Sequence, residues 1–127
     1  MLYADLMDDL VLAITIALEA TEIALAGFPS GQSPASELDE PLTTVDRKVE
    51  DFIVRQLCDR RPNDGVLGEE GTHIFSSNER RWLIDPIDGT HRLRAGDPCW
   101  RIHLALEDAV GVAVGVVAWP ALGFWWS

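Results

Sequence analysis

The stretch over residues 82–90, WLIDPIDGT, constrains this chain more than any other. A short apolar run leads into two carboxylates, Asp85 and Asp88, and Gly89 follows them directly. Because Pro86 cannot donate a ladder hydrogen bond and glycine accepts unusual backbone angles, we expect a strand that ends at Asp85 and turns sharply. Two carboxylates about 4 Å apart repel by roughly 4 kcal/mol at an effective dielectric constant of about 20. A bound cation would remove that cost, so the stretch predicts a cation-binding strand end.

Length and charge narrow the class of protein. The 127 residues and 47% hydrophobic content predict one domain over 1–127. A net charge of −11 argues against nucleic acid or an anionic membrane as a partner, but it permits cations. We find no apolar run near the roughly 18 residues that a membrane span needs, and the N-terminus lacks the basic start of a signal peptide. We therefore expect a cytoplasmic protein with no nucleic-acid and no membrane partner.

The hydrophobic periodicity predicts helices followed by strands. Apolar residues recur at helical spacing over residues 5–26 and 44–61. Strands are expected over about 65–68, 80–85, 99–107, 111–119 and 123–127. The near-continuous Val and Ala of 112–119 favours a central strand buried on both faces. We predict an α+β fold in which two N-terminal helices pack on one face of a largely antiparallel sheet, with a mobile loop over 28–41, a hairpin loop over 71–80 and an irregular connection over 91–98.

Acidic residues gather at three points of this expected fold. Asp46 lies near the start of the second helix, where capping-box spacing from Thr43 offers a purely structural alternative for it. Glu69 and Glu70 follow one strand, and Asp85 and Asp88 follow the next. Hard oxygen ligands from several positions fit Mg²⁺ or Mn²⁺ better than zinc.

Backbone amides beside these acids add a second kind of donor. If Gly89 and Thr90 open a helix or a nest, their N–H groups present donors to an anion. A metal ion next to an anion site indicates phosphate chemistry. The reaction class that follows is phosphomonoester hydrolysis.

Three segments resemble the inositol monophosphatase family of Mg²⁺-dependent, lithium-sensitive phosphatases: TTVDRKVE at 43–50, VLGEE at 66–70 and WLIDPIDGT at 82–90. The resemblance implies the N-terminal half of that family's α/β/α/β/α sugar-phosphatase fold. It implies that two or more Mg²⁺ ions are bound, that Mn²⁺ can replace them and that Li⁺ inhibits the activity. The implied metal ligands are Glu69, Asp85, the Ile87 carbonyl and Asp88. It also implies catalytic roles for Asp46, Glu69 and Thr90. Of these, Asp46 and Thr90 orient and activate the attacking water. The amides of Gly89 and Thr90 are implied to contact the phosphate.

The downstream part is most similar to the histidinol-phosphate phosphatase branch of actinobacterial type. The cues are the run Gly96, Pro98 and Trp100, and then GVVAWPALGFWW. This similarity implies a small phosphate monoester, histidinol phosphate of histidine biosynthesis, as substrate. Inositol 1-phosphate is the alternative substrate within the family.

The chain also departs from the family pattern. Arg92 and Leu93 stand at the usual Asn and Phe positions, residues 28–42 contain no lysine, and the resemblance covers only the first half of a family member. A further metal-ligand aspartate normally lies in the absent half. Three readings therefore stay open: a phosphatase that works as a homodimer or with a complementing C-terminal half, an inactive remnant or interaction domain that keeps the acid cluster, and an unrelated acidic α+β domain. In the first two, the uncovered sheet face should expose apolar surface.

Overall fold

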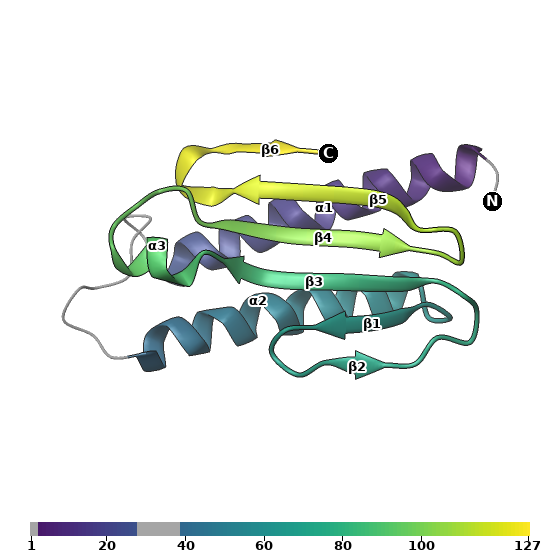
Figure 1. Cartoon of the computed structure of the whole chain (residues 1–127), viewed down its shortest axis with the longest axis horizontal. Helices are drawn as coiled ribbons and strands as arrows, with labels where there is room; N and C mark the ends of the chain where they lie inside the picture. The colour runs from purple at the N-terminus through teal and green to yellow at the C-terminus, as the bar shows by residue number, and fades with distance from the viewer. Residues whose placement is uncertain (1–2, 28–38) are drawn as a thin grey trace.

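The computed structural model describes residues 3–27 and 39–127, and Figure 1 shows its long helices behind one sheet. The helices are α1 (Tyr3–Gly27), α2 (Asp39–Arg60) and the short α3 (Thr90–Arg94), with a 3₁₀ turn, η1 (Pro120–Leu122). The strands are β1 (Gly65–Gly68), β2 (His73–Ile74), β3 (Arg81–Asp88), β4 (Arg101–Glu107), β5 (Val112–Trp119) and β6 (Phe124–Trp126). Most of the mobile loop expected over 28–41 lies outside the described residues.

The six strands form one sheet in the order β2-β1-β3-β4-β5-β6. Only β1 and β3 pair in parallel among these strands, and the other neighbours pair antiparallel. The expected α+β class, with two helices on a largely antiparallel sheet, is confirmed. The parallel pair matters for the site, because it places the carboxyl ends of β1 and β3 at the same edge of the sheet.

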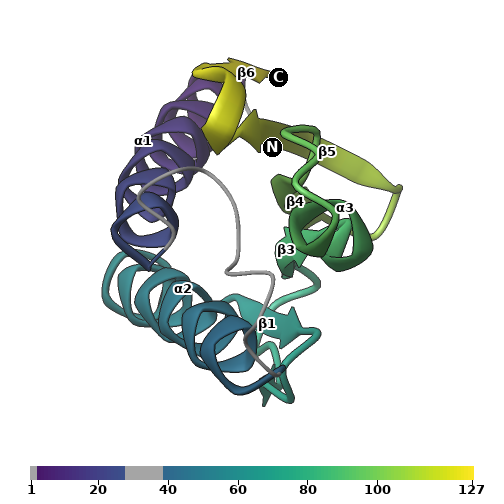
Figure 2. The same cartoon turned by 90° about the vertical axis from the view of Figure 1, so that its left-hand side faces the viewer.

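Both long helices cover the same face of the sheet, as Figure 2 shows from the end of the molecule. Alternate residues of β3 and β4 point towards them, which the strict period of two in the strands dictates. The most completely buried strand residues include Trp82, Ile102 and Leu106, and they meet Ile16 of α1 and Ile53 of α2. The core is therefore a single layer between the helices and one sheet face.

Helix α1 qualifies by length and composition as a membrane-spanning helix over Asp5–Gly27, contrary to the sequence expectation that no segment approaches that length. In this fold α1 is a core helix, and its small residues explain how it packs there. Ala13, Ala17, Ala20 and Ala24 are fully buried and allow α1 to lie close to the sheet and α2. In the structure this helix is part of the core.

Helix α2 and strand β3 are longer than expected. The second helix begins at Asp39 instead of near residue 44, because Pro41 falls in the first turn, where a missing N–H costs nothing. Asp46 thus lies about two turns inside the helix and cannot be part of an N-terminal capping box. Strand β3 does not end at Asp85 but runs on to Asp88, with an irregularity in its pairing to β4 between these two residues that accommodates the proline.

Three local expectations need correction. Strand β5 is not central and is not buried on both faces: β3 and β4 occupy the middle of the sheet, and only Val114, Val116 and Ala118 of β5 are buried. Strand β2 lies within the expected loop over 71–80, and α3 begins one residue before the expected irregular connection over 91–98 and occupies its first half. The exposure of apolar surface was expected, and β6 exposes Phe124 and Trp126.

Candidate functional site

The candidate site lies where β1 ends beside β3, which runs on for four more residues to Asp88. Their parallel register pairs Gly68 with Ile84, so Glu69 and Asp85 follow at neighbouring positions of the sheet edge. The Glu69 amide donates a hydrogen bond to the Ile84 carbonyl at 3.2 Å, which extends the contact one residue past the ladder. Helix α2 passes beside both strands and contributes Asp46 from its buried side. Acids from three separate segments thus converge, as the sequence predicted.

Asp46 is buried in this cluster, with 7% of its surface exposed. Burial raises the pKa of Asp46 from 3.8 to about 7, and the negative charges of Glu70, Asp85 and Glu69 add to the rise. Its Oδ1 atom has no hydrogen-bond partner among the described residues. A buried carboxylate oxygen without a partner is rare and costly, so this atom is a strong indication of a ligand.

Asp85 shares this condition. The pKa of Asp85 is raised to about 7. Burial is the largest cause, and the charges of Glu69 and Asp88 and a side-chain hydrogen bond with Glu69 also raise it. Its Oδ1 atom is also buried and unpartnered within the part of the chain that the structure describes. Without a cation, Asp46 and Asp85 therefore keep their protons to a higher pH than ordinary aspartates do.

Glu50 is a member of the site that the sequence analysis missed. It is almost fully buried on α2, one helical turn beyond Asp46. Its carboxylate accepts hydrogen bonds from the amides of Glu70, at 2.9 Å, and Thr72, at 3.3 Å, and from the Thr72 hydroxyl at 2.7 Å. Gly68 leaves room for it, because a Cβ atom there would lie 2.4 Å from the Glu50 carboxyl carbon. Glu50 therefore fixes the turn that carries Glu69, and its i, i+4 spacing from Asp46 was the available signal.

Asp88 differs from the other acids because it is already paired. Arg101 on β4 donates to its Oδ2 from Nε at 2.8 Å and from Nη2 at 2.6 Å, and His103 Nε2 lies 3.1 Å from the same oxygen. Partial burial opposes ionisation, but the bonds and charges of Arg101 and His103 outweigh it and lower the pKa of Asp88. Arg101 and His103 were not among the site residues predicted from the sequence. Their alternation with buried Ile102 was the signal.

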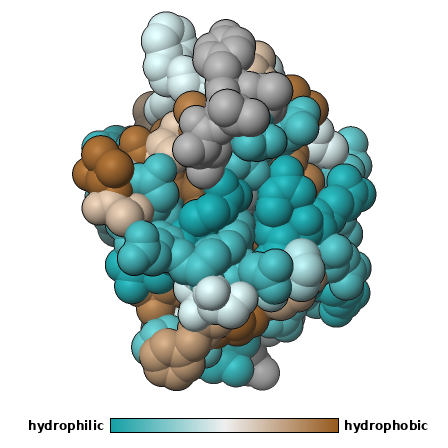
Figure 3. Space-filling view, turned by 90° about the vertical axis from the view of Figure 1, so that its right-hand side faces the viewer, coloured by the Kyte–Doolittle hydropathy of each residue, from teal (hydrophilic) through white to brown (hydrophobic). Residues whose placement is uncertain are grey.

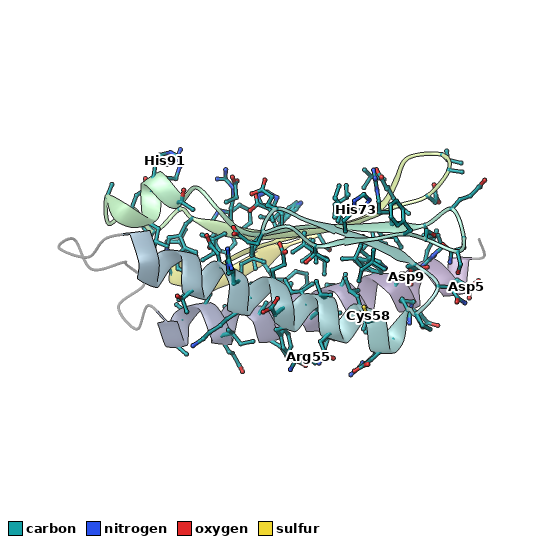
Figure 4. All side chains as sticks on the ribbon, turned by 90° about the horizontal axis from the view of Figure 1, so that it is seen from below. Asp5, Asp9, Arg55, Cys58, His73 and His91 are labelled. Carbon is teal, nitrogen blue, oxygen red and sulfur yellow. The ribbon has the colours of Figure 1, made fainter. Side chains whose placement is uncertain are left out.

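The remaining predicted residues lie next to Asp88. Gly89 adopts a φ of 83°, in the left-handed region that favours glycine, and caps α3, which Thr90 opens. The carbonyl of Gly89 accepts a hydrogen bond from the Arg92 amide at 2.9 Å. The side chain of Ile87 is buried, so only the backbone of this residue is suited to contact a ligand. Figure 4 shows His91 at this α3 end of the molecule, and Asp5 and Asp9 at the opposite end.

A shallow hollow of about 530 Å³ opens over the site on the face away from the helices. Glu69, Asp85, Asp88 and His103 line it, together with apolar residues of β1, β3 and β4. A larger hollow of about 840 Å³ lies at the opposite end, beside Asp9, Asp64 and Arg80. Because those two aspartates are already bound by arginine, the smaller hollow is the better candidate for chemistry.

The donor set of the site fits a hard divalent cation. Three carboxylates line the hollow beside one imidazole, and Asp46 and Asp85 have buried oxygens without a partner among the described residues. A finished coordination sphere is not preformed: within the described residues, no three His, Cys, Asp or Glu side chains are grouped closely enough to hold a metal ion. The site thus fits Mg²⁺ in its chemistry, and Asp88 is the ligand candidate that must change partners.

The fold and the site together define a class of protein: a helix-backed sheet that gathers carboxylates at one strand edge beside a glycine-capped turn. The model of the inositol monophosphatase family matches residues 5–127, and the chain belongs to this family.

Relatives and solved structures agree with this assignment. The chain is 39% identical over 117 residues to a histidinol-phosphatase of Chlorobaculum parvum. This match covers 91% of the chain and 45% of the relative. It is 40% identical over 124 residues to a histidinol-phosphatase of Mycobacterium tuberculosis, covering 94% of this chain and 47% of the relative. The crystal structure of the extragenic suppressor protein SuhB from Bartonella henselae superposes with a TM-score of 0.77 at 25% identity, over 90% of this chain and 44% of that one. The chain therefore spans less than half the length of these relatives.

Proposed function

We propose that this chain is the metal- and phosphate-binding part of a Mg²⁺-dependent phosphomonoesterase that acts on histidinol phosphate in the cytoplasm. The observation that carries the proposal is the pair of buried oxygens on Asp46 and Asp85 that have no partner among the described residues. Such oxygens are costly in a metal-free protein and are satisfied by a cation. The two histidinol-phosphatases described above support the choice of substrate.

Each site residue has a role in this proposal. Glu69, Asp85, the Ile87 carbonyl and Asp88 would hold Mg²⁺, in one or more ions, with Mn²⁺ as a substitute and Li⁺ as an inhibitor. Bound Mg²⁺ supplies polarisation of the phosphate, a lower pKa for bound water and stabilisation of the leaving oxygen. The Thr90 hydroxyl orients the attacking water and Asp46 accepts its proton, with Glu69 supporting the same water. The Gly89 and Thr90 amides donate to the phosphate oxygens.

A second candidate function is cation binding without turnover, as expected of a catalytically inactive remnant or interaction domain. The ion pair between Asp88 and Arg101 favours it, because a preformed ligand would not be bound to arginine. The two candidates share the metal centre and differ in activity. A homodimer or a complementing C-terminal half would supply the rest of the substrate pocket in the first candidate, and inositol 1-phosphate is its alternative substrate.

The metal centre is tested by thermal unfolding of the chelator-treated protein with increasing MgCl₂. A ligand at about 100 times its Kd stabilises a protein by about 2.7 kcal/mol, so the midpoint temperature should rise measurably. Asp88→Asn should abolish this rise. Asp59→Asn removes the same charge from an exposed position on α2 and should leave it intact. An unmutated protein that shows no rise contradicts the metal centre.

Activity separates the two candidates. The phosphatase predicts phosphate release from histidinol phosphate that requires Mg²⁺, exceeds release from inositol 1-phosphate and is inhibited by LiCl. A rise in midpoint temperature with Mg²⁺ but no release from either ester supports the remnant. Release that persists in excess chelator contradicts both.

A further inference from the structure

Strands β3 and β4 are joined by an ion pair at each end on the face away from the helices. At one end Arg81 of β3 lies opposite Glu107 of β4 and binds it, and at the other end Asp88 of β3 lies opposite Arg101 of β4 and binds it. In the first pair the arginine lies on β3 and the acid on β4, whereas in the second pair the acid lies on β3 and the arginine on β4. They differ in their surroundings, because only the pair at Asp88 lies beside the acid cluster of Asp46, Glu69 and Asp85.

The Arg101 contact engages Asp88 with two donors on one oxygen. Nε at 2.8 Å and Nη2 at 2.6 Å both approach Oδ2, and His103 Nε2 lies 3.1 Å from it. Two charge-assisted bonds from one guanidinium are stronger than ordinary hydrogen bonds. About a third of each side chain is exposed, so the pair is partly shielded from water and from screening salt. A cation that takes Oδ2 as a ligand must first remove this guanidinium.

We propose that Arg101 is an internal counter-ion that a divalent cation displaces from Asp88, so that breaking this ion pair sets the metal affinity of the site. The inference rests on the proposed function, because it takes the acid cluster as a cation site. It goes beyond that function by assigning to Arg101 a role that lowers affinity. In its absence Asp88 would be free to coordinate without the loss of two charge-assisted bonds.

Arg81 provides a matched control for this role. Arg81→Gln and Arg101→Gln each remove one positive charge from the same strand pair and the same sheet face, so they change the net charge equally. The two positions lie roughly 20 Å apart along the strands, which exceeds the screening length of about 8 Å at physiological ionic strength. A general effect of charge on cation binding would therefore be small for Arg81→Gln, and a direct release of Asp88 occurs only in Arg101→Gln.

The experiment is calorimetric titration of MgCl₂, and separately MnCl₂, into the three chelator-treated proteins at pH 7.5 and 0.15 M salt. Charge-assisted hydrogen bonds contribute enough that the Kd of Arg101→Gln should be about tenfold lower than that of the unmutated chain. The Kd of Arg81→Gln should lie within about twofold of it. Midpoint temperatures without metal confirm that all three proteins are folded.

The outcomes separate this inference from the proposed function. Equal affinities of Arg101→Gln and the unmutated chain, or weaker binding by Arg101→Gln, overturn the inference and leave the metal centre standing. Binding by Arg101→Gln alone overturns the metal centre of the unmutated chain but supports the inference, because Arg101 then blocks the site. Absence of binding in all three proteins overturns the metal centre and the inference with it.

Discussion

Two groups of buried acids lie at opposite ends of β3, and their surroundings differ. At the first end Asp9 binds Arg61 and Arg80, and Asp64 binds Arg80. Asp64 also accepts hydrogen bonds from Asn78 and from the indole of Trp82. At the second end Asp46 and Asp85 have buried oxygens without a partner in the described part of the chain. Figure 3 views the first end and shows its largely hydrophilic surface.

The difference appears in the pKa values of Asp64 and Asp46. Burial would raise the pKa of Asp64, but the hydrogen bonds from Arg80, Asn78 and Trp82 outweigh it and lower the pKa. Burial raises the pKa of Asp46, and the surrounding acids raise it further to about 7. One fold thus contains a cluster of acids paired with arginine, which we expect to stabilise it, and a cluster without such partners, which we expect to destabilise it. Buried acids without neutralising partners are found where a protein binds a ligand.

The largest effect is expected from Arg80→Met, which breaks the neutralised cluster. The substitution leaves Asp9 and Asp64 buried with fewer cationic partners, and loss of one member of a buried ion pair costs about 3 kcal/mol or more. Urea unfolding at pH 7 should show this loss in the free energy of unfolding. A cost below about 1 kcal/mol would mean that the cluster is not the stabilising member of the comparison.

Glu50→Gln should have the next largest effect. Glu50 is a buried acid of an intermediate kind, because backbone amides and a hydroxyl satisfy it in place of a cation. A glutamine amide nitrogen must face one of these donors, which should cost about 2 kcal/mol in the free energy of unfolding. The turn that carries Glu69 should loosen, so Mg²⁺ affinity measured by calorimetry should fall as well. Lower stability with unchanged affinity would show that Glu50 does not position the site.

The pH dependence of stability should distinguish the second cluster from the first. The folded-state pKa of Asp46 and of Asp85 is raised from 3.8 to about 7, so the folded chain holds protons that the unfolded chain has lost. Stability of the metal-free chain should therefore fall as pH rises from about 4 to about 7 and then level off. Water screens part of this effect at the site, so we expect it to be smaller than that of Glu50→Gln.

Asp46→Asn checks this assignment by unfolding at pH 5 and pH 8. The variant should lose less stability between the two pH values than the unmutated chain and be more stable at pH 8 without metal. Saturating Mg²⁺ should remove the difference between pH 5 and pH 8 in the unmutated chain. If the variant lost as much stability between pH 5 and pH 8 as the unmutated chain, the raised pKa of Asp46 would not be the cause of that loss.

Arg81→Gln should have the smallest effect. Its ion pair with Glu107 is exposed to solvent, and such pairs contribute about 0.5 kcal/mol or less. Urea unfolding should place the variant within that range of the unmutated chain. A much larger loss would mean that the ion pairs between β3 and β4 hold the sheet together, and that the pair at Asp88 is structural too.

The sequence predicted the fold well where periodicity was strong. The helical spacing of α1 and α2 and the alternation of β4 are local properties of the chain, and the structure has these elements. Strand β5 was misjudged because its Val and Ala residues are apolar on both sides, and periodicity cannot show whether a second layer covers the outer side. The start of α2 was misplaced because Pro41 was taken to precede the helix, whereas proline also fits a first turn.

The composition of the site was predictable to a smaller extent. Glu69 and Asp85 are visible in sequence because each follows a short apolar run that predicts a strand, and Asp46 because it lies near the predicted start of the second helix; the fold brings them together. The partners of Asp88 were not visible, because the pairing of Arg101 with Asp88 depends on the register of β3 against β4. Glu50 was overlooked because its role is to accept backbone hydrogen bonds from a turn whose path only the structure gives.

The placement of the acids along the chain also orders events during synthesis. Every carboxylate of the site lies between Asp46 and Asp88, on α2, β1 and β3, so the cluster is complete in sequence before β4 is translated. Arg101 follows Asp88 by 13 residues. A nascent chain that has reached α3 therefore already carries all the acids of the site but not the guanidinium that pairs with Asp88.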